Sequence, residues 1–136
     1  MTQTMHRRHL MLTTLAALAL AACSPAAPPE WQVSLDEARQ LLERGDAVVF
    51  DIREADEHAD GVAQGMRLLP VSQLDKRLAE IPTDPAQPVL IICATQSRSS
   101  TVVRALREAG WTHVRYVDGG MVGWVRRGWP VFKPMG

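Results

Sequence analysis

The sequence is poor in cysteine and has no excess of either charge. Only Cys23 and Cys93 carry a thiol, so a disulfide within the chain would need both. Lysine and arginine together number 15, as do aspartate and glutamate, and this balance argues against a nucleic-acid partner. His58 and His113 stand far apart, and neither is spaced against Cys93 as zinc ligands usually are, so we expect no metal.

Long apolar runs and internal repeats are also missing. The stretch Leu10–Leu20 is shorter than the about 20 residues that cross a bilayer, which disfavours a permanent transmembrane helix. It follows a segment with Arg7 and Arg8 and no acidic residue, which is the pattern of an export signal. Without repeats, the chain is expected to form one domain.

The end of this stretch, Leu20-Ala21-Ala22-Cys23, resembles a bacterial lipoprotein cleavage box. The resemblance implies a signal peptide over residues 1–22 and a lipid on Cys23. The protein would be anchored in the cell envelope facing the periplasm, in the outer membrane if the organism is Gram-negative, because Ser24 rather than Asp follows. Residues 23–30 are small and proline-rich and predict a flexible tether before a domain over residues 31–136. Cleavage without lipidation, leaving a soluble periplasmic protein, is the alternative.

Strand and helix signals alternate along the rest of the chain. A capping pattern at Ser34 and a glycine at Gly45 bound the first helix. Ser72 and Pro82 bound a later one. Further helices are expected near 54–59, 99–109 and 120–127, and strands over 47–52, 67–69, 88–92 and 113–117. This order predicts an α/β fold, with a mostly parallel sheet of about five strands and helices on both faces.

Cys93 follows the apolar run Val89–Ile92, which predicts a buried strand, and precedes a segment with helical spacing. Ligands of open α/β sheets bind at the carboxyl ends of strands. The N–H groups at a helix start and the charge of Arg98 would favour an anion or a thiolate there. If Cys23 is lipidated, Cys93 has no disulfide partner and is either a reactive thiol or a buried inert one.

The order Cys93, four residues, Arg98, Ser99 resembles the active-site loop of the rhodanese family, whose members move sulfane sulfur through a cysteine persulfide. Other blocks resembling that family lie at 48–57, 61–70 and 118–131, so the resemblance covers roughly residues 31–133. It implies a rhodanese-like fold and a sulfurtransferase of the thiosulfate type. The expected partners are a small anionic sulfur donor and a thiol or cyanide acceptor, with no metal or organic cofactor. The sequence does not indicate the oligomeric state.

The resemblance also implies site roles. Cys93 would be the nucleophile and Arg98 a second catalytic residue, while Ser99 would offer its hydroxyl to the site or cap the helix. Asp51 would orient the loop by pairing with Arg98, or else cap the helix near residue 54. Arg53 would attract the donor or form a surface pair with the glutamate four residues on. The remaining substrate-binding positions are those whose backbone amides surround the sulfur, namely Ala94, Thr95, Gln96, Ser97 and Ser99.

Two positions depart from the family pattern. Gln96 stands where glycine is usual, and if that position needs a positive φ, the side chain would strain the loop. Val62 replaces the usual histidine. Gln96 keeps open a sulfur-carrier or anion-binding module without fast turnover. A small phosphatase or arsenate reductase is less favoured, because phosphatase loops have five residues between cysteine and arginine.

Overall fold

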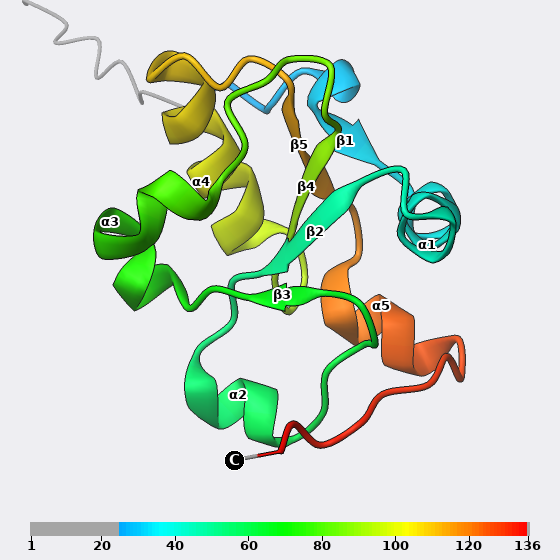
Figure 1. Ribbon diagram of the computed structural model, residues 1–136. Helices are drawn as coiled ribbons and strands as arrows, with labels where there is room; N and C mark the ends of the chain where they lie inside the picture. Colours follow the sequence, from blue (N-terminus) through cyan, green and yellow to red (C-terminus); the bar gives the residue numbers. More distant parts are fainter. Residues whose placement is uncertain (1–24, 136) are drawn as a thin grey trace, which may run out of the picture.

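The computed structural model describes residues 25–135, and the elements below lie within that range. Parallel strands form a five-stranded sheet in the order β1-β5-β4-β2-β3, as Figure 1 shows. The strands are β1 (Gln32–Val33), β2 (Val48–Asp51), β3 (Arg67–Leu68), β4 (Val89–Ile92) and β5 (Val114–Val117). The predicted α/β class and parallel sheet are confirmed.

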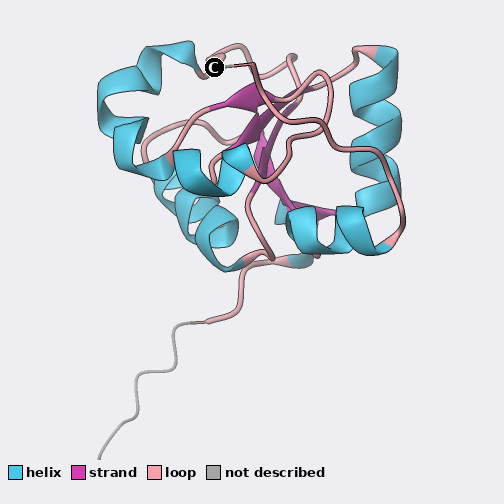
Figure 2. Cartoon of the chain, turned by 90° about the horizontal axis from the view of Figure 1, so that it is seen from below, coloured by secondary structure: helices cyan, strands magenta, loops and turns pink. Residues whose placement is uncertain are grey.

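Helices cover both faces of the sheet, as Figure 2 shows from below. On one face α3 and α4 pack against side chains such as Phe50 and Ile91. On the other face α1 and α5 pack against Val49 and Leu90. The remaining helix, α2, lies beyond the end of β2. The helices are α1 (Leu35–Arg44), α2 (Ala55–Ala59), α3 (Leu74–Arg77), α4 (Ser97–Glu108) and α5 (Gly120–Arg126).

The central strand β4 is buried on both faces, since all four of its residues are 0% exposed. Burying a Leu, Ile or Val side chain contributes about 1.5–3 kcal/mol, so this strand fixes the centre of the core. In the parallel register Asp51 pairs with Ile92. The next residues along both strands therefore emerge at the same edge of the sheet, where Cys93 begins its loop.

Several predicted boundaries are confirmed and one helix differs. Ser34 Oγ accepts a hydrogen bond from the Glu37 N–H at 3.1 Å, and Gly45 ends α1 with φ of 72°. The helix predicted between Ser72 and Pro82 is instead α3 between two short 3-10 turns, at Val71–Gln73 and Leu78–Glu80. The reason lies in Ser72, whose N–H and hydroxyl both donate to the Glu54 carboxylate rather than capping a longer helix.

The first described residues run along α4. The Pro25 carbonyl accepts a hydrogen bond from Arg104 at 2.9 Å, Ala27 packs against the core, and Pro29–Trp31 form a 3-10 turn. The predicted signal peptide and Cys23 lie outside the described residues. Within residues 25–135, no helix is long and apolar enough to cross a membrane.

Candidate functional site

Cys93 lies directly after β4, and its side chain is 0% exposed. The Ser99 N–H donates to Cys93 Sγ at 3.4 Å, and the thiol contacts Ser99 Oγ at the same distance. The Ser99 hydroxyl also lies 3.2 Å from the Gln96 carbonyl, to which it donates. Ser99 is fully buried and lies in the first turn of α4, so of the two roles predicted for it, its hydroxyl contacts the sulfur.

The backbone of the Cys93 loop is held by the start of α5. The Met121 N–H donates to the Cys93 carbonyl at 2.8 Å, and the Val122 N–H donates to the Ala94 carbonyl at 2.9 Å. A Cβ at Gly120 would lie 2.2 Å from the Thr95 carbonyl oxygen, closer than nonbonded atoms approach. Gly120 therefore permits the loop and helix to touch, a role that sequence reasoning did not assign although the paired glycines before a helix are a visible signal.

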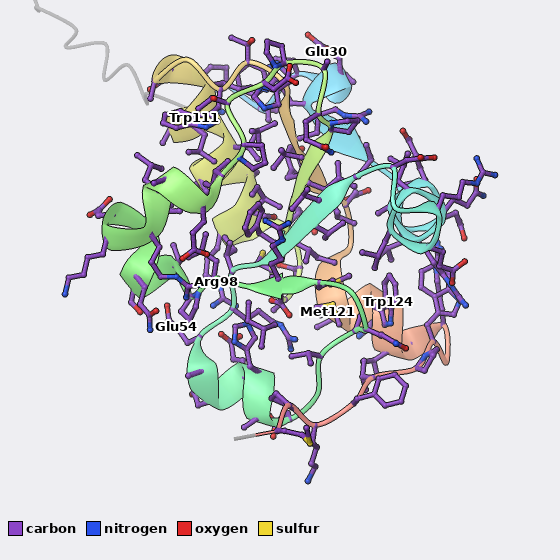
Figure 3. All side chains as sticks on the ribbon, viewed as in Figure 1. Glu30, Glu54, Arg98, Trp111, Met121 and Trp124 are labelled. Carbon is purple, nitrogen blue, oxygen red and sulfur yellow. The ribbon has the colours of Figure 1, made fainter. Side chains whose placement is uncertain are left out.

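Arg98 is held by Glu57 of α2. Its two terminal nitrogens donate to the two carboxylate oxygens of Glu57, each at 2.7 Å, and the Glu54 N–H donates to the same carboxylate at 2.8 Å. The hydrogen bond from Arg98 is the main cause that lowers the pKa of Glu57 from 4.5 to about 2. The same bond raises the pKa of Arg98, and the nearby Cys93 charge adds a smaller upward effect. Both groups therefore stay charged. Figure 3 shows Arg98 and Glu54 on the same side of the molecule.

Asp51 makes a different contact from the one predicted. Its carboxylate is fully buried and receives Arg53 Nη2 at 2.6 Å and Nε at 3.0 Å, with His58 Nε2 at 3.4 Å. The expected pair between Asp51 and Arg98 is wrong, because Arg53 is two residues away in sequence and reaches the carboxylate first. Asp51 also accepts the Arg53 N–H at 3.1 Å, which fixes the turn after β2.

Of the two roles predicted for Arg53, the surface pair with the Glu57 side chain is not found. Arg53 is 8% exposed, and besides binding Asp51 its Nη2 donates to the Gly61 carbonyl at 2.9 Å. It contacts Glu57 through that residue's backbone carbonyl, at 3.4 Å, so the alternative of a side-chain pair is wrong. His58 completes this buried cluster, and no spacing in the sequence singles it out.

Gln96 is not strained in the way the sequence suggested. Its backbone has φ of −150° and ψ of 0°, and no non-glycine residue among the described ones has a positive φ. The positive φ on which the predicted strain depended is therefore absent at Gln96. Thr95, Gln96 and Ser97 form the exposed rim of the loop.

Val62, the other departure, joins the C-terminal segment. It exchanges two backbone hydrogen bonds with Phe132, each at 2.8 Å.

In residues 25–135, there is no group of three or more His, Cys, Asp or Glu side chains placed to hold a metal ion.

An open depression of about 380 Å³ lies beside the Cys93 loop. Ala94 forms its wall on the loop side, next to the residue that carries the thiol. Side chains of α5 form an apolar wall, while charged side chains come from both α2 and α5. The lining residues are Arg53, Glu57, Asp60, Ala94, Met121, Val122, Val125 and Arg126.

Comparison with known proteins identifies the family. The profile of the Rhodanese-like domain matches residues 34–127. A sulfurtransferase of Allochromatium vinosum is 31% identical over 99 residues, covering 73% of this chain and 91% of that protein. The human thiosulfate:glutathione sulfurtransferase is 30% identical over 107 residues, covering 70% of this chain and 93% of that protein.

The structure agrees with the sequence comparison. The human single-domain sulfurtransferase TSTD1 superposes with a TM-score of 0.60 at 28% identity, covering 71% of this chain and 96% of that one. Residues 34–127, which match the family profile, include the strand that precedes Cys93, the loop and α4. The chain therefore belongs to the rhodanese-like family, and the two relatives described above are named as sulfurtransferases.

Proposed function

We propose that this protein is a thiosulfate-type sulfurtransferase that carries sulfane sulfur on Cys93. The observation that carries the proposal is the thiol at the end of β4, contacted by the N–H and hydroxyl of Ser99 at the start of α4. The Ser99 N–H, which donates to this sulfur, stabilises a negative sulfur more than a neutral one, because hydrogen bonds to an ionised acceptor are stronger. The names of the human relative and of other similar proteins support thiosulfate as donor.

The proposed reaction has two halves. The Cys93 thiolate attacks the outer sulfur of thiosulfate, the S–S bond of thiosulfate breaks, and sulfite leaves with the electron pair. The cysteine then carries a persulfide. An acceptor thiolate or cyanide attacks the outer sulfur of that persulfide, and the Cys93 thiolate is released. This division into two transfers is nucleophilic catalysis, and it needs no metal or organic cofactor.

Arg98 places a guanidinium at the loop, and Glu57 holds it in a fixed position. Glu57 binds the Arg98 guanidinium through two hydrogen bonds, which fix the plane of the guanidinium. In the sequence, Arg98 comes directly after the exposed rim of the loop. A preorganised charge costs little reorganisation as negative charge develops on sulfur. Arg53 is paired with Asp51, so we assign it the support of the loop edge rather than the capture of the donor.

The test separates sulfur binding from turnover. After incubation with thiosulfate, intact-mass measurement should show the gain of one sulfur atom on Cys93, and added cyanide should remove it as thiocyanate. Cys93→Ser should fold, as judged by circular dichroism, yet gain no sulfur and form no thiocyanate. Sulfur transfer by the Cys93→Ser protein would end the proposal. Because Gln96 has a negative φ, the positive-φ strain that kept open a carrier without turnover is absent.

We also propose that Cys23 carries a lipid and holds the domain at a membrane facing the periplasm. The motifs in the sequence support this proposal. The described residues begin two positions after Cys23, at Pro25, whose carbonyl accepts a hydrogen bond from Arg104 of α4.

A further inference from the structure

The first described residues of the chain are bound to one side of the domain. The Pro25 carbonyl accepts a hydrogen bond from Arg104 of α4 at 2.9 Å. Ala27 and Trp31 pack against the core cluster between α4 and the sheet, and the guanidinium carbon of Arg107 lies 4.9 Å from the centre of the Trp31 ring. Both arginines belong to one helix, so the chain enters the domain along α4.

The distance between this entry point and Cys23 is limited by the length of the chain. Ser24 alone stands between Cys23 and Pro25. Two residues of fully extended backbone span at most about 7 Å. A lipid on Cys23 would therefore enter a bilayer close to α4, and that helix would lie nearer to the membrane than the opposite face of the domain.

The surface beside α4 is suited to contact with lipid. An open groove of about 290 Å³ lies between α3 and α4, and its apolar lining includes Leu74 and Leu78 of α3 and Ala105 of α4. Trp111 also lines this groove, while its indole N–H donates to the Ile81 carbonyl at 3.3 Å. A tryptophan with an apolar ring and a paired N–H is typical of the interface between lipid headgroups and hydrocarbon.

The depression beside Cys93 lies on the other side of the sheet. Its walls come from α2, α5 and Ala94 of the loop. The helix α5 packs on the sheet face opposite to α4. Figure 2 shows the helices on the two sides of the strands. A membrane that lies against α4 therefore leaves the walls of the depression on the side away from the lipid.

We propose that the anchored domain rests with α4 against the bilayer, so that the depression beside Cys93 opens toward the aqueous phase. The partner of the α4 face is the lipid surface itself. The sulfur donor and acceptor therefore reach Cys93 from solution rather than from within the membrane. This inference rests on the lipid proposed above for Cys23, and it adds the orientation that such a short connection imposes on the domain.

The tryptophans of the chain report on this orientation, because they divide between the two faces. Trp31 and Trp111 pack with the cluster under α4, and Trp124 and Trp129 pack with the cluster under α5. Figure 3 shows one of each pair, Trp111 and Trp124, at opposite corners of the molecule. A quencher at the membrane surface should therefore affect one pair more than the other.

The test uses the full chain, expressed in a bacterium that processes lipoproteins and purified in detergent. Intact mass first shows whether Cys23 is the N-terminal residue and carries lipid. The protein is then bound to phosphatidylcholine vesicles that carry a nitroxide on the headgroup, which quenches nearby tryptophan fluorescence. The quenched fraction is compared between wild type, Trp111→Phe and Trp129→Phe, since each substitution removes one reporter from one face. Circular dichroism checks that both variants fold.

Trp111→Phe should lower the quenched fraction, because it removes a ring close to the membrane. Trp129→Phe should raise it, because the ring that it removes lies beyond the reach of the nitroxide.

The matched control leaves the sequence of the folded domain unchanged. An insertion of about ten Gly and Ser residues between Ser24 and Pro25 adds a flexible linker of about 16–19 Å, so the domain is free to turn. The insertion should lower the total quenching and remove the opposite effects of the two substitutions. On vesicles, wild type and the insertion protein should gain sulfur from thiosulfate at the same rate, because the depression already faces water.

A quenched fraction that falls with Trp129→Phe rather than with Trp111→Phe, or that the insertion leaves unchanged, would overturn the proposed orientation. Faster sulfur loading by the insertion protein would also overturn it, since the bilayer would then cover the site in wild type. A processed chain without lipid would instead overturn the proposed anchor, and with it this inference, before any vesicle is added. Failure of both proteins to gain sulfur would overturn the proposed sulfur transfer, and the quenching would still decide the orientation.

Discussion

The contact between Gly120 and the Cys93 loop leads to a sharp prediction for Gly120→Ala. The added Cβ would lie 2.2 Å from the Thr95 carbonyl oxygen and 2.5 Å from that of Ala94. Both atoms belong to backbone and cannot turn aside as the end of a side chain could. The loop or the start of α5 must therefore move, and the variant should lose both stability and sulfur transfer.

The magnitude follows from two separate costs. Gly120 has φ of 57°, and a residue with a Cβ in this left-handed region costs roughly 1–2 kcal/mol. Separating the loop from α5 breaks the hydrogen bonds at Cys93 and Ala94, each with a net value of about 0.5–1.5 kcal/mol. The free energy of unfolding should fall by roughly 2–5 kcal/mol, the sum of these costs.

Gly128→Ala is the matched control. Gly128 also has a positive φ, 70°, but a Cβ there would meet nothing within 4 Å. It should show the backbone cost alone, about 1–2 kcal/mol, and keep normal persulfide formation. Urea unfolding and the intact-mass assay measure the two effects. If Gly120→Ala lost no more stability than Gly128→Ala and loaded sulfur at the wild-type rate, the proposed role of this contact would be refuted.

Three further predictions concern other residues. Glu57 has a pKa lowered to about 2, so its contribution to stability should be present above its ordinary value of 4.5 and be lost as pH falls towards 2. Glu57→Gln should remove that pH dependence in unfolding experiments, and an unchanged acid limb would contradict the pairing with Arg98. Gln96→Gly should not raise turnover, because no strain is relieved, and should lower the free energy of unfolding by about 0.5–1 kcal/mol through chain entropy. A rise in thiocyanate formation would contradict this. Cys23→Ser should leave the membrane fraction while keeping sulfur transfer, since Cys93 lies in a separate folded domain. A variant still processed and membrane-bound would contradict lipidation.

The fold could be predicted from the sequence because its signals are local and repeated. Each signal depends only on residues close to it in the sequence. This holds for the apolar run of β4, the cap at Ser34 and the glycine after α1, and all three agree with an alternating α/β order. The strand β1 has only two residues, which is too short for any periodicity. The broken helix around α3 was mispredicted because Ser72 bonds to Glu54, 18 residues earlier in the chain.

The position of the candidate site was also predictable. Parallel strands end at the same edge of a sheet, so Asp51 and Cys93 had to come close once both strands were recognised. Cys93, Arg98 and the helix that contains Arg98 follow one another directly in the sequence. Residues near one another in the chain leave few alternatives for their relative placement.

The pairing of charges was the part that the sequence could not supply. Four charged groups meet near the loop, and they can combine as Asp51 with Arg98 or as Asp51 with Arg53. The second combination prevails because Asp51 and Arg53 follow the same strand, and because Glu57 is placed by its bond to the Glu54 N–H where it can receive Arg98. Each carboxylate thereby binds one guanidinium through both of its oxygens.

This pairing changes which groups are available for substrates. With Arg53 and Arg98 both bound to carboxylates, the net charge they present to an anion is smaller than their number suggests, since each pair is neutral as a unit. The exposed charges that line the depression and lack such partners among the described residues are Asp60 and Arg126. Because each buried or half-buried carboxylate is matched by one arginine, the edge of the sheet near the loop carries two neutral pairs rather than two free cations.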